Sequence, residues 1–314
     1  MSRYRNLARF VLLAAVWGTA FTAIKAGLAF FPPVLFAALR YDLAGVLMLG
    51  YAWVVTDRPV PRTRGEWGLV AVGAVFMFAG YHSFLFVGEQ HTTSAAAAVV
   101  VSLSPVLTAA FARLLLPDER LTVVGLLGLL LGLVGVVVLA HPDPSNLLGG
   151  DAGGELLILG AAASFSLGSV LARRSPADLP LETLEAWAMV GGALLMHGAS
   201  LGLGESFAAV RWTPTGLLAL GYLVIAASAV GFLLYFDLLD RLGPVEINLV
   251  SYAVPVVAAL TGLAFLGERP SALTGLGFLL ILAGFALLKR DALVAALRAW
   301  TASNGAGGRR QWEP

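Results

Sequence analysis

The stretch SLSPVLTAAFARLLLPDERLTVVGLLGLLLGLVGVVVL (102–139) returns in altered form as SYAVPVVAALTGLAFLGERPSALTGLGFLLILAGFALL (251–288). Each copy is an apolar run with a proline near its start, then a Glu-Arg break, then a second apolar run with spaced glycines. Pro105 corresponds to Pro255, and Arg120 corresponds to Arg269, at offsets of 150 and 149 residues. A repeat at about half the chain length indicates a fold built from two copies of one unit.

The composition places the chain in a membrane. Of 314 residues, 59% are hydrophobic and 12% are charged, whereas soluble domains carry about 25% charged residues. Apolar stretches long enough to cross the hydrocarbon core recur along the chain, because a spanning helix needs about 20 apolar residues. We therefore predict an all-α polytopic membrane protein.

Several kinds of site are not indicated. The chain has no cysteine, so it forms no disulfide and no thiolate metal site. It has no phosphate-binding loop that would indicate driving by ATP, and no basic surface with aromatic residues that would indicate a nucleic-acid partner. The sequence therefore predicts no cofactor, no metal and no enzyme activity.

The apolar runs predict ten transmembrane helices, five in each half. They are expected over residues 7–30, 33–55, 66–88, 92–115, 121–140, 154–172, 182–203, 214–236, 244–266 and 271–289. The expected organisation is a first repeat over 1–140, a linker over 141–153, a second repeat over 154–290, and a tail over 291–314. The tail is expected to be cytoplasmic and disordered at its Gly-rich end.

The basic residues predict the orientation. With the N-terminus inside, sixteen lysines and arginines fall on the cytoplasmic side, and Arg211 and Arg269 fall on the other side. Positive charge collects on cytoplasmic loops, so both termini are predicted to be cytoplasmic in a multi-pass protein of the inner or plasma membrane. Five spans per repeat also place the second repeat upside down relative to the first. Inverted repeats around a midplane site are a recurring design of secondary transporters.

Further motifs extend the repeat. The segment VWGTAFTAIKAGL (16–28) aligns with SFSLGSVLARRSP (164–176). The pattern W-G-x-x-F-x-x-x-K from Trp17 to Lys25, the proline turn that follows, Arg40, and the Pro…Glu-Arg…Gly…Gly signature closing each half resemble the EamA-type repeat of the drug/metabolite transporter superfamily. The second copy departs from the pattern, with Phe165 and Ser169 in place of the fuller motif.

This resemblance implies a ten-helix carrier with inverted five-helix repeats around a central cavity. Members of the superfamily move amino acids, purines, sugars or amphipathic cations, and many are exporters. We therefore expect a secondary exporter of small metabolites, amino acid-like or amphipathic, working by alternating access without ATP. Its expected partners are a small-molecule substrate and the lipid bilayer, and a homodimer is a further possibility. The alternative is a non-transporting membrane protein, such as a lipid-modifying enzyme or an assembly scaffold.

The first two helices carry one group of candidate residues. Trp17, Phe21 and Lys25 are spaced at i, i+4 and i+8, so they share a face that could line the cavity. Lys25 and Arg40 each lie seven residues from the Pro32-Pro33 turn, which places them at about the same depth, roughly 10 Å below the outer boundary. They could bind an anionic ligand or form a gate. Alternatively, they pair with backbone carbonyls or extend to the interface.

The third helix carries His82, with Glu89 two turns further along. Histidine titrates near neutral pH, so the pair could form part of a proton path. The alternative is a structural histidine with satisfied hydrogen bonds and a glutamate at the membrane interface.

Helices four and nine carry the last group of cavity candidates. A proline frees a backbone carbonyl one turn earlier, which a membrane tolerates only where something satisfies it. We expect kinks at Pro105 and Pro255, and polar side chains beside them that contact substrate. Those side chains are Ser102, Ser104, Asn248, Ser251 and Tyr252. The glycines of helix five predict close helix packing, within the bundle or at a dimer seam.

Overall fold

The computed structural model describes residues 2–116, 123–141, 150–242, 247, 249–288 and 290. Every secondary-structure element in these ranges is helical, which confirms the predicted all-α class for the part of the chain that the structure describes. The predicted tail 291–314, most of the predicted linker and the Glu119-Arg120 turn lie outside the described residues.

Helices follow one another through both halves. Those of the first half are α1 (Ser2–Leu28), α2 (Pro33–Val55), α3 (Arg64–Val72), η1 (Gly73–Gly80), α4 (Tyr81–Glu89), α5 (Ser94–Val101), α6 (Ser104–Leu115) and α7 (Val123–Ala140). Those of the second half are α8 (Gly150–Arg174), α9 (Leu181–Gly202), η2 (Phe207–Ala209), α10 (Pro214–Gly221), η3 (Tyr222–Val230), α11 (Gly231–Leu242), α13 (Val250–Thr261), η4 (Gly262–Leu266) and α14 (Ala272–Leu288).

Local sequence explains several helix ends. Thr63 and Glu66 form a reciprocal capping box at the start of α3, which satisfies two backbone donors that have no partner within the helix. Thr93 and Thr213 accept backbone hydrogen bonds at the starts of α5 and α10. Gly267, with φ of 67°, ends η4 in the left-handed conformation that glycine adopts most easily.

Four runs that were expected to be continuous α-helix contain an irregular segment. The run expected over 66–88 passes through the π-helical η1, and the run expected over 214–236 passes through the π-helical η3. Helix four is broken at Ser102 and Leu103. Pro105 lies just after that break, in the first turn of α6, where its missing N–H is not needed. Pro255 lies inside α13, in the run expected over 244–266. That run has a turn earlier, at Leu249, and it ends in the π-helical η4. The two prolines therefore occupy different positions in their helices.

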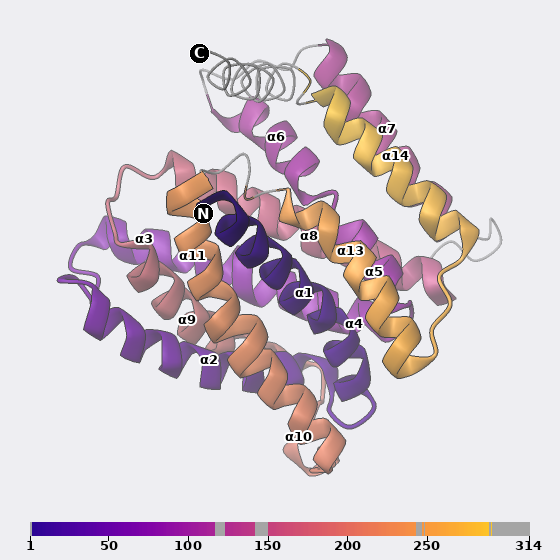
Figure 1. Cartoon of the computed structure of the whole chain (residues 1–314). Coiled ribbons are helices and arrows are strands. Elements are labelled where there is room, and N and C mark those ends of the chain that lie inside the picture. Colours follow the sequence, from indigo (N-terminus) through magenta and orange to yellow (C-terminus); the bar gives the residue numbers. More distant parts are fainter. Residues whose placement is uncertain are drawn as a thin grey trace, which may run out of the picture.

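The closest helix pair is α7 and α14, which lie side by side at one edge of the molecule in Figure 1. A Cβ added to Gly135 would lie 2.7 Å from the carbonyl oxygen of Gly277, and a Cβ added to Gly277 would lie 2.6 Å from that of Gly135. These glycines let the two backbones touch. The glycine face of α7 is therefore used for packing inside the chain.

The remaining helices form the main body of the fold. There α2 packs against α9, α1 packs against α13, and α8 packs against η1, α4 and α6. Large apolar side chains face outward, including Val54, Leu201 and Phe265 at 84%, 76% and 74% exposed. An outer surface this apolar suits contact with lipid rather than water.

Seven helices within the described residues are long and apolar enough to cross a membrane. They cover Arg5–Leu28, Pro33–Val55, Arg64–Glu89, Ser94–Leu115, Val123–Ala140, Ala152–Arg174 and Pro214–Leu239. Two shorter apolar helices cover Val250–Leu266 and Ala272–Leu287. Together they support a multi-pass arrangement.

Candidate functional site

A group of buried polar side chains lies where helices of both halves meet. Arg40 donates from Nε to Ser228 Oγ at 3.2 Å, and the hydroxyl of Tyr41 lies 2.6 Å from His82 Nε2. We call Arg40, Tyr41, His82 and Ser228 the central polar cluster. All four are at most 6% exposed. Buried polar groups in a membrane are costly and mark functional sites by default.

The tautomer of His82 follows from its partners. Its Nδ1 lies 3.0 Å from the carbonyl oxygen of Phe78, which can only accept, so Nδ1 carries the hydrogen. In the neutral ring, Nε2 is then an acceptor and the Tyr41 hydroxyl donates to it. Two of the sequence candidates, Arg40 and His82, both contact Tyr41, since the guanidinium carbon of Arg40 lies 4.9 Å from the centroid of the Tyr41 ring.

Trp17 adjoins this cluster through η3. Its Nε1 donates to the carbonyl oxygen of Ala227 at 3.1 Å, one residue before the Ser228 that binds Arg40. Its ring contacts Phe232 and Tyr235, with centroids 6.2 and 5.6 Å away. A π-helical segment loosens the regular ladder of backbone hydrogen bonds and is frequent at functional sites. The η3 segment therefore supplies a carbonyl to Trp17 and a hydroxyl to Arg40.

The other half repeats this arrangement with different side chains. Ser164 of α8 donates from Oγ to the carbonyl oxygen of Phe76 in η1 at 2.7 Å. A glycine allows each crossing. A Cβ on Gly80 would lie 2.5 Å from Ser164 Oγ, and a Cβ on Gly231 would lie 2.6 Å from Trp17 Nε1. In both halves, the first helix of one repeat reaches a π-helical carbonyl of the other.

Lys25 lies away from the central polar cluster. Its Nζ donates to the carbonyl oxygens of Glu89, Gln90 and Thr92 at 2.7, 3.1 and 2.8 Å, at the carboxyl end of α4. Seven residues separate Glu89 from His82, which is about 10 Å of helix. The charged ends of Lys25 and Arg40 therefore do not meet at one depth. Phe21, at 6% exposed, packs in the apolar core.

The serines beside the break in helix four satisfy their own helix. Ser102 Oγ donates to the carbonyl oxygen of Val99 at 2.6 Å, and Ser104 Oγ donates to that of Val101 at 2.7 Å. These bonds use the hydroxyl hydrogens that a substrate would otherwise accept. No hydrogen bond among the described residues joins either serine to the central polar cluster.

The candidates in the run expected over 244–266 do not join the central polar cluster by any hydrogen bond among the described residues. Tyr252 packs on Phe285 of α14, with ring centroids 4.6 Å apart. Its hydroxyl is buried without a partner among the described residues. Ser251 is half-buried. Asn248 lies outside the described residues.

Three residues of the centre were missed by sequence reasoning. Tyr41 and Ser228 have no motif that singles them out, because a tyrosine and a serine occur freely in apolar helices. Glu185 is 8% exposed in α9, the helix that packs against α2. It could have been found, since an ionisable residue inside a predicted span is a functional candidate.

The arrangement suits binding better than bond-making chemistry. The described residues hold no group of three or more His, Cys, Asp or Glu side chains that could bind a metal. A guanidinium has five N–H donors, and one of those of Arg40 reaches Ser228. Its other donors suit a carboxylate or phosphate, to which guanidinium binds in bidentate fashion.

The fold and the central polar cluster together indicate a multi-pass membrane protein with buried polar side chains between its two halves. The EamA-like transporter family matches residues 7–140 and 152–290. The chain therefore belongs to the EamA-like transporter family and is a membrane transporter.

Known proteins resemble it along most of its length. The uncharacterized inner membrane transporter YedA of Escherichia coli K12 is 29% identical over 260 residues, covering 82% of each chain. The uncharacterized transporter YvbV of Bacillus subtilis 168 is 25% identical over 290 residues, covering 92% of each. A solved crystal structure is similar over 92% of this chain and 99% of its own, with a TM-score of 0.64 and 26% identity. Relatives named as transporters agree with the expectation of a protein that is not an enzyme.

Proposed function

We propose that the protein is a secondary carrier that exports small amino acid-like or amphipathic metabolites by alternating access, without ATP. The observation that carries the proposal is Arg40, a buried guanidinium held by Ser228 of the opposite half. A cation in this place contributes to function when it binds an anionic group. A carboxylate of the substrate would complete its hydrogen bonds.

Glu185 supports the amino acid-like class. It is a buried carboxyl on α9, which packs against α2, the helix that carries Arg40. An ammonium group could bind on that side while a carboxylate binds Arg40. The aromatic rings of Trp17 and Tyr235 would flank an apolar side chain. Export is the direction that the resemblance to drug/metabolite transporters favours.

The proposed architecture is ten helices in two inverted five-helix repeats. The pairing of helices supports it, because several of the main contacts between the halves have a counterpart. The packing of α1 on α13 matches that of α8 on α6, and the packing of α2 on η3 matches that of α9 on η1. The α2–α9 and α7–α14 pairs join equivalent helices. The π-helical segments η1 and η3 begin 149 residues apart, at the repeat offset. The third π-helical segment, η4, has no π-helical counterpart among the described residues of the first half. Alternating access then follows from rocking of one repeat against the other.

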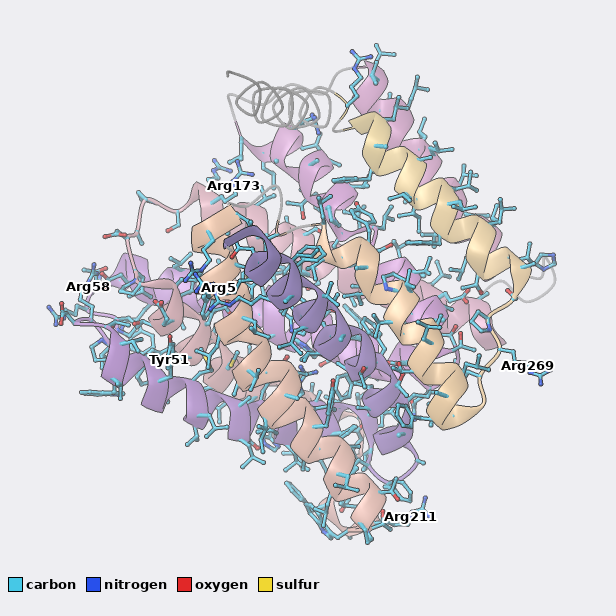
Figure 2. The ribbon with its side chains drawn as sticks, viewed as in Figure 1. Arg5, Tyr51, Arg58, Arg173, Arg211 and Arg269 are labelled. Atoms are coloured by element: carbon cyan, nitrogen blue, oxygen red, sulfur yellow. The ribbon has the colours of Figure 1, made fainter. Side chains whose placement is uncertain are left out.

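We further propose that both termini are cytoplasmic. Figure 2 shows Arg5, Arg58 and Arg173 toward one end of the helices, and Arg211 and Arg269 toward the opposite end. This separation supports the orientation that the positive-inside rule gives. We call the end that carries Arg211 and Arg269 the outer end.

The test is transport by the purified chain in liposomes, over a panel of amino acids, amines and carboxylates. Arg40→Gln should weaken the apparent affinity for the transported compound at least about tenfold, because a hydrogen bond to a charged group contributes about 1.5–3 kcal/mol. Arg62→Gln is the matched control, since Arg62 is exposed in the loop before α3. Equal transport by Arg40→Gln and the unaltered chain would contradict the proposed site.

A further inference from the structure

Five elements of both repeats converge on a second polar group at the outer end. It consists of Lys25 at the end of α1, Glu89 at the end of α4, Ser94 at the start of α5, Glu155 in α8, and Glu268 after η4. We call it the outer cluster. Glu268 Oε2 accepts from the backbone N–H of Ser94 at 3.0 Å, and Glu155 Oε1 accepts from Thr92 Oγ1 at 3.1 Å.

Glu89 differs from the other acids of this cluster. It is 0% exposed, and neither of its carboxyl oxygens has a hydrogen-bond partner among the described residues. The hydroxyl of Ser94 is likewise 0% exposed and without a partner there. Lys25 acts on Glu89 electrostatically, but its ammonium hydrogens are taken by three backbone carbonyls. From the sequence, a position of Glu89 at the membrane interface was one alternative. In the structure the side chain of Glu89 is completely buried.

The burial of Glu89 without hydrogen-bond partners favours the neutral form of its carboxyl group. An ionised carboxylate without hydrogen bonds is far costlier to bury than a neutral carboxyl group. Glu89 is also the last residue of α4, where the helix dipole is negative and opposes a further negative charge. The nearby carboxylate of Glu268 acts in the same sense. Binding a proton removes these three costs at once.

We propose that Glu89 is a proton-binding site whose occupation closes the outer end of the transporter. The proposal rests on the proposed alternating-access function and adds its regulating ligand. When the outer end is closed, the carboxyl group is neutral and buried. When α1 and α4 separate, water reaches Glu89, the O–H bond breaks and the proton passes to water, which leaves a hydrated carboxylate. A ligand that binds one state better shifts the population toward that state.

Other titratable groups face this site and must be separated from it in a test. Lys25 faces it from α1, Glu155 from α8, and Glu268 from the turn after η4. On its own helix, Tyr81 interacts electrostatically with both Glu89 and Arg40, and His82 lies two turns away. His91, in the following turn, is exposed. Arg40 and Tyr41 face α4 from α2.

The first test is infrared spectroscopy of the purified chain in lipid. The carbonyl stretch of a protonated carboxyl group is separate from that of a carboxylate. We expect a band of a buried protonated carboxyl that Glu89→Gln removes and that Glu182→Gln, at the opposite end of the fold in α9, leaves in place. A spectrum that Glu89→Gln does not change would overturn the proposal.

The second test follows the outer end directly. Spin labels on cysteines introduced at Gln90 and Arg269, both exposed, report the distance between α4 and the turn after η4. In the otherwise unaltered chain, lowering the pH should increase the fraction of short distances. Glu89→Gln should keep the short distance at every pH. An unchanged pH response in Glu89→Gln would contradict the proposal. Neither test needs a substrate, so its failure is distinct from failure of transport at Arg40.

Discussion

At the scale of single residues, the orientation of His82 depends on Tyr41. The Tyr41 hydroxyl donates to Nε2, and the Phe78 carbonyl accepts from Nδ1, so the ring is fixed at both nitrogens. Both side chains are buried. A buried polar atom that loses its partner costs more than the hydrogen bond itself contributed.

We therefore expect Tyr41→Phe to destabilise the protein by about 1–3 kcal/mol, because it leaves His82 Nε2 buried without a partner. Thermal unfolding in detergent measures the effect. Tyr51→Phe, on the same helix and half-buried, is the control and should change little. A melting temperature of Tyr41→Phe equal to that of Tyr51→Phe would show that the hydrogen bond does not form.

The charged residues show what a sequence can and cannot specify at this scale. Lys25 and Arg40 were identified as intramembrane cations from the sequence, but not their partners. Lys25 binds the carbonyls after α4, and Arg40 binds Ser228, 188 positions away in the chain. Such partners depend on how distant helices cross, which no local pattern encodes. The same reason explains why Ser102 and Ser104, chosen for their neighbouring proline, bond to their own helix instead.

At the scale of elements, the π-helical segments η1 and η3 mark where the halves cross. The apolar periodicity of residues 66–88 and 214–236 predicted plain helices, and it predicted their positions well. It could not predict η1 and η3, because widening of a helix depends on the distant helix that crosses it and bonds to its carbonyls. Here the neighbours are Ser164 and Trp17.

Gly231 tests the second of these crossings. A Cβ at this position would lie 2.6 Å from Trp17 Nε1, so Gly231→Ala should displace the indole and cost about 1–3 kcal/mol through overpacking. Gly221→Ala is the control, because nothing lies within 4 Å of a Cβ at Gly221. Thermal unfolding of the two variants compares them. Equal stability would contradict the close approach of α1 to the η3–α11 junction.

The α7–α14 pair gives a matched test within one helix. A Cβ at Gly277 would lie 2.6 Å from the carbonyl oxygen of Gly135, whereas nothing lies within 4 Å of a Cβ at Gly275. Gly277→Ala should separate the two backbones and lower stability, while Gly275→Ala should not. Resistance to proteolysis in detergent measures the difference. Loss of resistance in Gly275→Ala alone would contradict the packing.

At the scale of the whole molecule, the repeat organises both polar groups. The central polar cluster lies between the halves and joins α2 to η3, while the outer cluster draws on elements of both repeats at one end. The stretch 102–139 and its copy 251–288 made the two-copy architecture predictable. Composition made the membrane class predictable, and the apolar periodicity made the positions of the helices predictable. The clusters themselves were less predictable, since each needs helices from both copies. Of the outer cluster, the sequence singled out Lys25 and raised Glu89 as an open alternative.

In the proposed architecture, the second repeat crosses the membrane in the opposite direction to the first. The chain has no cysteine, so a single cysteine introduced at Arg120 or at Arg269 reports one copy of the Glu-Arg turn without background. The measurement is labelling with a membrane-impermeant maleimide in intact cells and again after permeabilisation. We expect the cysteine at 269 to be labelled in intact cells and the cysteine at 120 to be labelled only after permeabilisation. Labelling of both from the same side would contradict the proposed architecture.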